Sequence, residues 1–266
     1  MSRVFISGSS DGLGLMAARL LVDGGHEVTL HARNTARAED ARRTVPQAKA
    51  VAVGDLSSIE ETRRVAEQVN ALGRHDAVIH NAGVGYREAR RIETVDGLSH
   101  VFAVNVLAPY LLTALITPPD RLVYLSSGMH VGGDPHLRDP QWAARRFEWR
   151  ASLLGQQAAR RCVGVRRGSP VAERAVQPLE PGWVPTKMGG PGAPDDLSLA
   201  PVTQVWLAVS DDPAATVPGQ YFYHQQRHRV KPAALRTDLE DELLSYCAGL
   251  AGVPFPRELR KDDWET

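Results

Sequence analysis

Residues 7–14, with the sequence SGSSDGLG, have the types and spacing that could bind the diphosphate of a dinucleotide. An apolar run precedes them and an apolar-periodic stretch follows, so the order predicted is strand, turn and helix. Gly8 would allow a tight turn, Gly12 would let a diphosphate approach the backbone, and Gly14 would let the helix pack closely on the strand. The unpaired amides at the helix start would attract an anion. Glycine, serine and aspartate are also ordinary turn residues, so a plain turn is the alternative.

Two other residues, further along the chain, could select and hold the adenosine half of such a ligand. Arg33 follows a predicted strand, 28–31, where an NAD-preferring site usually has a carboxylate. A guanidinium suits a 2′-phosphate, so Arg33 favours NADP, with NAD as the alternative cofactor. The alternative without a function is that Arg33 is a solvated surface arginine. Asp55 follows a third strand, 49–53, and could accept from an adenine amino group or cap the helix that begins near Ser58.

Polar and small residues also follow the fourth and fifth predicted strands, 76–80 and 122–125. Asn81-Ala82-Gly83 would permit close backbone approach to a ligand, and Ser126-Ser127 lies where open α/β sheets bind ligands. Asn105 lies inside an apolar stretch, 95–116, that predicts one long buried helix. A buried amide needs partners, so a structural role for Asn105 is the alternative to a catalytic one.

The elements that would position these residues alternate between strand and helix five times. This pattern predicts an α/β fold, a Rossmann-type doubly wound parallel sheet in a single domain over 1–266. Helices are predicted over 13–21, 35–43, 59–72, 201–209 and 239–250, and a last strand over 219–224. The glycine- and proline-rich loop 186–200 is predicted to cover the substrate, and 225–266 to form a C-terminal extension. Trp183 and Trp206 are expected in the core.

Composition excludes several classes of function. The chain has 31 basic and 31 acidic residues, which gives no reason to expect a nucleic acid or a membrane as partner. An arginine-rich stretch, 138–174, could be a nucleic-acid patch, but it lacks regularly interleaved aromatic residues. Two cysteines provide neither a disulfide framework nor a metal site, so no metal is predicted. No leader or membrane-spanning run is visible, which predicts a cytoplasmic protein.

Together these segments resemble the short-chain dehydrogenase/reductase family, with PGWVPT at 181–186 as a further match. The resemblance implies hydride transfer between a nicotinamide cofactor and a small-molecule alcohol or carbonyl substrate, and it leaves a homo-oligomer open. It implies that Ser127 hydrogen-bonds the reacting oxygen and that Asn105 holds a proton-relay water. The cofactor residues that it implies are Gly8, Ser10, Gly12, Leu13 and Gly14 at the diphosphate, Arg33, Asp55 and Leu56 at the adenosine, Asn81, Ala82 and Gly83 at the ribose, and Pro181, Gly182, Val184 and Thr186 at the nicotinamide.

The chain departs from the family at the catalytic acid. The family has a tyrosine with a lysine four residues later, yet no tyrosine lies between Tyr124 and Tyr221 and no lysine between Lys49 and Lys187. The residues LLGQQAARRCV, 153–163, allow codons that read YSDSKLHDVV in the next frame, which restores YxxxK at the family position. We therefore predict two compensating frame errors bounding about 149–179. The alternatives are a diverged segment and a catalytically inactive NAD(P)-binding protein, because loss of a proton donor costs a factor of roughly 100 to 10,000.

Overall fold

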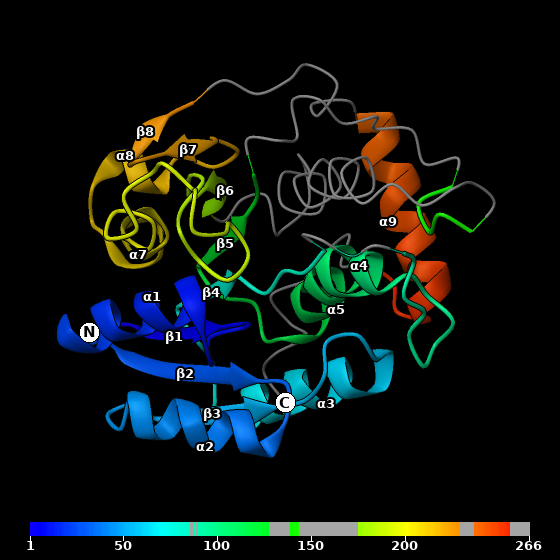
Figure 1. The fold of residues 1–266 in the computed structure, drawn as a ribbon, viewed down its shortest axis with the longest axis horizontal. Coiled ribbons are helices and arrows are strands. Elements are labelled where there is room, and N and C mark those ends of the chain that lie inside the picture. Colours follow the sequence, from blue (N-terminus) through cyan, green and yellow to red (C-terminus); the bar gives the residue numbers. More distant parts are fainter. Residues whose placement is uncertain (86–87, 89, 128–138, 144–174, 229–236, 256–266) are drawn as a thin grey trace, which may run out of the picture.

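The structure is a computed structural model that describes residues 1–85, 88, 90–127, 139–143, 175–228 and 237–255. Its centre is an eight-stranded sheet in the order β3-β2-β1-β4-β5-β6-β7-β8 (Figure 1). All neighbouring pairs are parallel except β7 and β8, which form an antiparallel hairpin. The strands are β1 Arg3–Ile6, β2 Glu27–Ala32, β3 Ala50–Val53, β4 Ala77–His80, β5 Arg121–Leu125, β6 Ala175–Glu180, β7 Phe222–Tyr223 and β8 Gln226–Arg227. This confirms the doubly wound parallel sheet.

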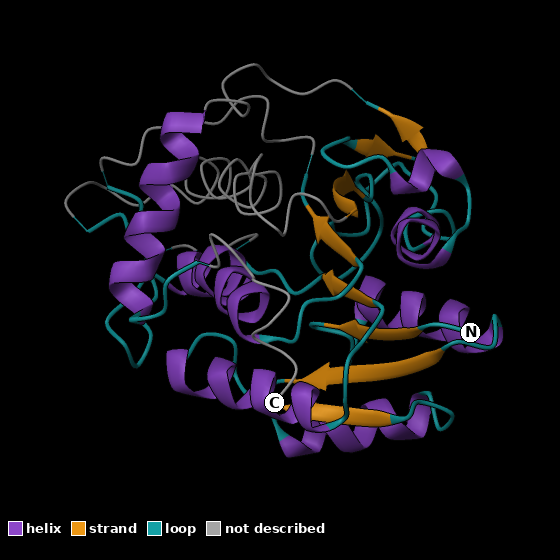
Figure 2. Cartoon of the chain, turned by 180° about the vertical axis from the view of Figure 1, so that it is seen from behind, coloured by secondary structure: helices purple, strands orange, loops and turns teal. Residues whose placement is uncertain are grey.

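Helices cover both faces of the sheet, as Figure 2 shows from behind. One face carries α1 Gly12–Asp23, α2 Thr35–Thr44, α7 Val202–Val209 and the short α8 Pro213–Thr216. The other face carries α3 Ile59–Ala71, α4 His100–Phe102, a π-helical segment η1 Ala103–Leu107 and α5 Ala108–Leu115, with α9 Thr237–Ala251 packed outside α5. The helix expectations hold to within about two residues for α1, α2, α3, α7 and α9.

The strand sequences explain this layering. In β1, Phe5 enters the core under α3 and α5, whereas Val4 and Ile6 enter the core under α1 and α7. Successive side chains of a strand point to opposite faces, and a parallel sheet is covered on both. All three residues are fully buried, which is why the strand is a continuous apolar run. The strand therefore holds the turn that follows it between two packed layers.

Three expectations about elements were wrong. The predicted helix 95–116 begins only at His100, because a turn with Gly97 at φ +73° precedes it and Val95 is exposed. The same helix changes to π-helical geometry around Asn105. Strand β6 was not predicted, and the predicted strand 219–224 is only the two-residue β7, after which the chain forms a further strand, β8.

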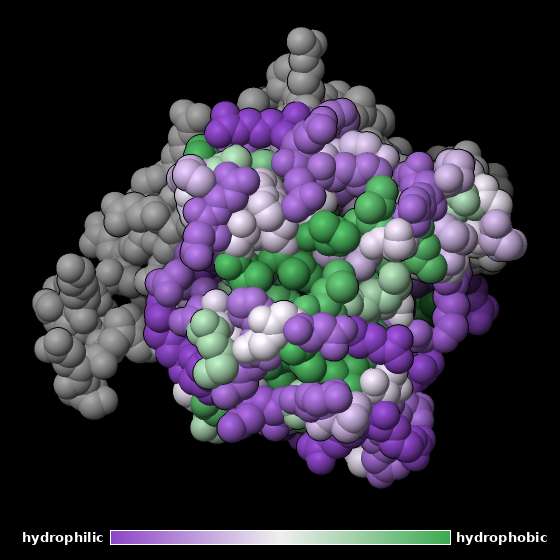
Figure 3. Space-filling model, turned by 90° about the vertical axis from the view of Figure 1, so that its left-hand side faces the viewer, coloured by the Kyte–Doolittle hydropathy of each residue, from purple (hydrophilic) through white to green (hydrophobic). Residues whose placement is uncertain are grey.

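The outer face of α1 and α7 is partly apolar. Figure 3 shows apolar residues gathered at the middle of this side, with polar residues around them. Leu15, Val205, Trp206 and Val209 are half-buried there and pack against the core. Trp206 therefore contacts the core, as expected, but the core does not fully enclose it. Among the described helices, none is both long and apolar enough to cross a membrane.

Candidate cofactor and active site

The predicted site residues lie at one edge of the sheet. The turn 7–14 follows β1, Arg33 follows β2, Asp55 follows β3, Asn81 follows β4, and Ser127 follows β5. Pro181 and Gly182 follow β6 in the same way. These six strands are parallel, so their carboxyl ends share an edge, with β1 and β4 as direct neighbours at its centre. The topology therefore brings together segments that are up to about 175 residues apart in the sequence.

The glycine-rich turn has the geometry that its spacing predicts. Gly8 has φ +65°, and an added Cβ would lie 2.7 Å from the Cα of Ala82. At Gly14, an added Cβ would lie 2.5 Å from Asn81 Nδ2 and 2.6 Å from the carbonyl oxygen of Gly8. Gly12 has φ +55°, and nothing lies within 4 Å of its Cβ position. Gly8 and Gly14 thus close the turn against β4, whereas Gly12 leaves open space beside the start of α1, which fits an approaching diphosphate.

Asn81 fastens the turn from the neighbouring strand end. Its Nδ2 donates to the carbonyl oxygens of Ser7 at 3.1 Å and Gly8 at 2.9 Å. The amide of Ala82 also donates to Ser7 Oγ at 3.1 Å. The Asn81 side chain and the Ala82 amide therefore brace the glycine-rich turn.

His31, at the end of β2, was not singled out from the sequence. Its Nδ1 accepts from the amide of Gly8 at 2.9 Å, and its Nε2 bonds to the carbonyl oxygen of Gly54 at 2.9 Å. The ring is buried, and burial lowers the pKa of His31 from 6.5 to about 4. The imidazole is therefore neutral with its proton on Nε2, because Nδ1 must accept. It links the glycine-rich turn to Gly54, which follows β3.

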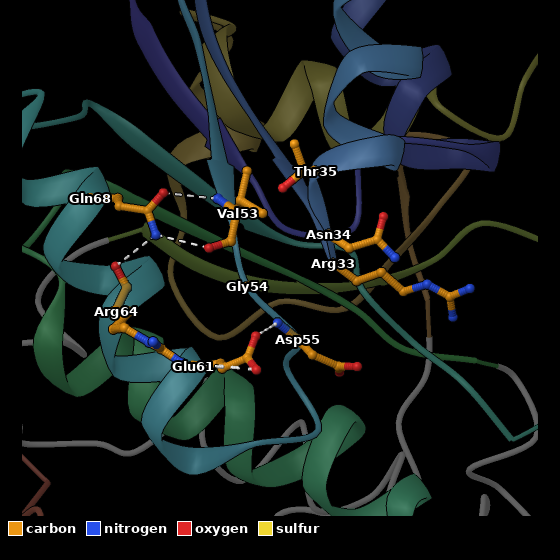
Figure 4. A pocket seen from close by; sticks show the side chains of 9 residues that line it. All are labelled: Arg33, Asn34, Thr35, Val53, Gly54, Asp55, Glu61, Arg64 and Gln68. Carbon is orange, nitrogen blue, oxygen red and sulfur yellow. Dashed lines mark hydrogen bonds and ion pairs between the residues drawn. The ribbon is translucent and has the colours of Figure 1, made fainter.

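A cavity of about 560 Å³ beside the carboxyl ends of β2 and β3 contains the predicted Arg33 and Asp55 (Figure 4). It is lined by Arg33, Asn34, Thr35, Val53, Gly54, Asp55, Glu61, Arg64 and Gln68. Gln68 bonds both the amide and the carbonyl of Val53, each at 2.9 Å, and Glu61 Oε2 accepts from the amide of Asp55 at 2.7 Å. Asp55 Oδ1 accepts from Ser57. These bonds fix the backbone at the end of β3. Leu56, predicted at this site, has its side chain in the core.

The two catalytic candidates lie in different settings. Asn105 is buried in η1, and its amide bonds Val84 twice: Oδ1 accepts from the Val84 amide and Nδ2 donates to the Val84 carbonyl, both at 2.9 Å. The side chain therefore ties the helix to the loop after β4. Ser127 is half-buried directly after β5, beside Ser126, whose amide donates to Leu179 at 2.6 Å. The segment expected to supply the tyrosine and lysine lies outside the residues that the structure describes, which resume at Ala175.

The loop after β6 is folded on itself. Asp195 Oδ2 accepts from the amide of Trp183 at 2.6 Å, and Trp183 Nε1 donates to the carbonyl of Gly189 at 2.9 Å. Thr186 Oγ1 accepts from the Gly189 amide at 3.1 Å. Val184 is buried, but the Trp183 side chain is 58% exposed, so its expected place in the core was wrong. The lysine at the loop tip, Lys187, forms an ion pair with Asp11 in the glycine-rich turn.

No group of three metal-binding side chains occurs among the residues that the structure describes.

The family model for the short chain dehydrogenases matches residues 2–128. The chain is 43% identical over 259 residues to an uncharacterized oxidoreductase of Emericella nidulans, covering 96% of this chain and 99% of that protein. It is 37% identical over 270 residues to a short-chain dehydrogenase of Penicillium rubens, covering 96% and 100%. A solved structure of an uncharacterized protein from Mycobacterium paratuberculosis superposes with a TM-score of 0.80 at 25% identity, covering 96% and 95%. The chain belongs to the short-chain dehydrogenase/reductase family.

Proposed function

We propose that the protein transfers hydride between a nicotinamide dinucleotide, with NADP favoured over NAD, and an alcohol or carbonyl substrate. The family implies NAD(P). The observation that carries the proposal is the turn 7–14, where crowding at Gly8 and Gly14 and open space at Gly12 form a cradle beside a helix start. When bound, the nicotinamide would supply or accept the hydride.

The cofactor residues follow from their places along the sheet edge. Gly8, Ser10, Gly12, Leu13 and Gly14 would hold the diphosphate, and Asn81, Ala82 and Gly83 would line the ribose. Pro181, Gly182, Val184 and Thr186 would flank the nicotinamide. Ser127, at the end of the central strand β5, would hydrogen-bond the reacting oxygen. Because the Asn105 side chain is taken by Val84, we infer that a relay water would bind its backbone, where π-helical geometry changes the carbonyl pairing.

The preference for NADP rests on charge in the cavity that contains Arg33 and Asp55. Arg33 is exposed at the cavity wall, and Asn34 caps α2 by accepting from Arg37 at 3.0 Å. A 2′-phosphate near Arg33 would meet a guanidinium and the amino end of α2, both of which favour a dianion. Asp55 would accept from the adenine amino group through the oxygen not used by Ser57.

Whether a polypeptide with the printed sequence catalyses hydride transfer depends on the missing tyrosine and lysine. The relative from Emericella nidulans aligns across 96% of this chain and 99% of its own length, so the two chains correspond over nearly their whole lengths. Compensating frame errors would leave that correspondence intact. Strand β6 pairs in register with β5 and buries Val176 and Leu179, which favours a downstream error before Ala175 rather than at 179. The second candidate is an inactive NAD(P)-binding protein, favoured if the written residues are those translated.

Two experiments test this proposal. Sequencing the coding DNA across codons 140–185 should reveal one upstream and one downstream indel relative to the frame that encodes YSDSK, and the absence of these two indels would contradict the frame errors. The written chain and a chain with YSDSK restored from codon 153 should then be assayed with NADPH and a panel of carbonyl compounds. We expect turnover only in the restored chain, and loss of it when its tyrosine is changed to phenylalanine. A homo-oligomer and a cytoplasmic location remain predictions, testable by light scattering and by imaging.

A further inference from the structure

The tip of the loop after β6 contacts the glycine-rich turn through one charged group. Lys187 Nζ donates to Asp11 Oδ2, across 176 positions of sequence. The Asp11 carboxylate also caps α1, since Oδ1 accepts from the Gly12 amide at 2.8 Å. A second cation, Arg37 of α2, lies 3.7 Å from the same Oδ2. Asp11 thus connects the cofactor turn, α2 and the loop tip.

The loop is braced internally, because Trp183 Nε1 donates to the Gly189 carbonyl and the Thr186 amide donates to the Val184 carbonyl, which tie its tip to its base. Its base is held by the Trp183–Asp195 backbone and side-chain bonds and by the buried Val184. Its tip is mostly exposed: the Lys187 side chain is 81% exposed and Met188 is 39% exposed. Among the hydrogen bonds and ion pairs of the described residues, the one from Lys187 to Asp11 joins the tip to the glycine-rich turn, so the loop can move away from the turn as a folded unit when this pair breaks.

A carboxylate beside a diphosphate cradle is electrostatically costly unless it is neutralised. The hydrogen bond from Lys187 is the largest cause of the lowered pKa of Asp11, so the pair favours the ionised carboxylate. Without Lys187, a negative charge would face the phosphates with only the more distant Arg37 to offset it.

On the basis of the proposed function, we infer that Asp11 and Lys187 are positioning residues that clasp the tip of loop 181–195 over the glycine-rich turn and slow dissociation of the dinucleotide. Neither residue takes part in hydride transfer. Exposed pairs of this kind are weak, so the clasp changes rates by small factors rather than abolishing binding.

The first test needs no cofactor. Lys187 is itself a trypsin cleavage site, so the rate of cutting between Lys187 and Met188 reports how often the tip is free. In Asp11→Asn, cleavage there should be about two- to fivefold faster, with cleavage after Lys49 as the internal reference. An unchanged ratio of the two cleavage rates would show that the pair does not hold the tip.

The second test is NADPH dissociation, followed by stopped-flow fluorescence for the wild type, Asp11→Asn, Lys187→Gln and the double variant. Asp11→Asn should dissociate about two- to fivefold faster at low salt, with a smaller difference at 0.5 M salt. Lys187→Gln should be the fastest, because it leaves Asp11 uncompensated, and adding Asp11→Asn should return it to the rate of Asp11→Asn alone. Lys49→Gln is the matched control, since Lys49 pairs with Glu27 at 3.9 Å just before β3, away from the site.

The results separate the clasp from the proposed function. Equal dissociation rates in all variants, or a double variant faster than Lys187→Gln, would overturn the clasp while leaving NADPH binding intact. Faster trypsin cleavage with unchanged dissociation would also overturn it, because the tip would then not govern release. If NADPH does not bind any variant, the proposed function fails together with this inference, and the trypsin ratio still decides whether the pair holds the tip.

Discussion

Replacing His31 should remove a pH-dependent part of the folding free energy. In the folded protein the neutral ring accepts from Gly8 and donates to the carbonyl of Gly54. A protonated ring would place a second N–H against the Gly8 amide, and burial keeps the pKa near 4 although Asp55 favours the charged form. In the unfolded chain the pKa is close to 6.5. Between pH 7.5 and 5.0 the unfolded state therefore gains a proton that the folded state does not.

This difference has a definite sign and size. Stability falls as pH falls below 6.5, because the unfolded state binds more protons. With pKa values of about 4 and 6.5, the linkage relation gives a loss of about 2 kcal/mol between pH 7.5 and 5.0. The assay is urea unfolding of the wild type and His31→Asn at both pH values. The variant should be less stable at pH 7.5, but its further loss on going to pH 5.0 should be about 2 kcal/mol smaller than that of the wild type.

His75 provides the matched control. Its pKa is also lowered to about 4, chiefly by burial, but its Nε2 bonds Thr29 Oγ1 far from the glycine-rich turn. His75→Asn should likewise reduce the acid sensitivity of folding while leaving NADPH affinity unchanged, whereas His31→Asn should weaken NADPH binding. If His31→Asn loses as much stability as the wild type between the two pH values, the neutral, turn-bracing histidine is refuted.

Three further substitutions test the site. Arg33→Ser should weaken NADPH binding at least tenfold by loss of about 1.5–3 kcal/mol of charge-assisted bonding, with NADH affinity unchanged, as measured by calorimetry; equal losses for both cofactors would contradict a 2′-phosphate role. Gly14→Ala should destabilise the protein by roughly 1–3 kcal/mol in urea unfolding, because its Cβ would lie 2.5 Å from Asn81 Nδ2. Asn105→Leu should cost roughly 2–4 kcal/mol in the same assay, because it removes both partners of Val84; a neutral effect would refute the structural role.

Much of the fold was predictable because its signals are local. Short, mostly apolar runs predict strands that are buried on both faces, and β1 to β5 follow them. Asp11, Asn34 and Ser58 cap the helices α1, α2 and α3, which is why those boundaries could be placed closely. Several of the proposed site residues rest on the same local signals, since the turn 7–14, Arg33, Asp55, Asn81 and Ser127 each follow one of these strands, whereas Asn105 lies in η1 and Pro181 follows the unpredicted β6.

Strand β6 was missed because Pro178 lies inside it, and proline usually excludes a central strand. The structure explains its tolerance. The Leu179 carbonyl accepts from Ser126 after β5, so Pro178 faces the opposite side, where β7 begins to pair only at Leu179. Its missing N–H therefore removes no ladder bond to β5.

The other features that the sequence did not predict depend on contacts between distant segments. No local pattern indicates that His31 would bond Gly8 and Gly54, although a histidine at the end of a strand beside a glycine-rich turn is a usable signal. The pairing of Asp11 with Lys187 depends on how the loop after β6 folds back. The exposure of Trp183 likewise follows from its bond to the Gly189 carbonyl and not from its residue type.

The central claim is that the turn 7–14 binds a nicotinamide dinucleotide, and calorimetric titration of the written chain with NADPH and with NADH tests it most directly. Saturable binding at one site per chain, tighter for NADPH, is the result we predict, because the cradle is formed by the turn 7–14 and the residues after β4 and does not need the missing tyrosine and lysine. Absence of binding by either cofactor at millimolar concentration, in material whose circular dichroism shows folded helix and sheet, would contradict it.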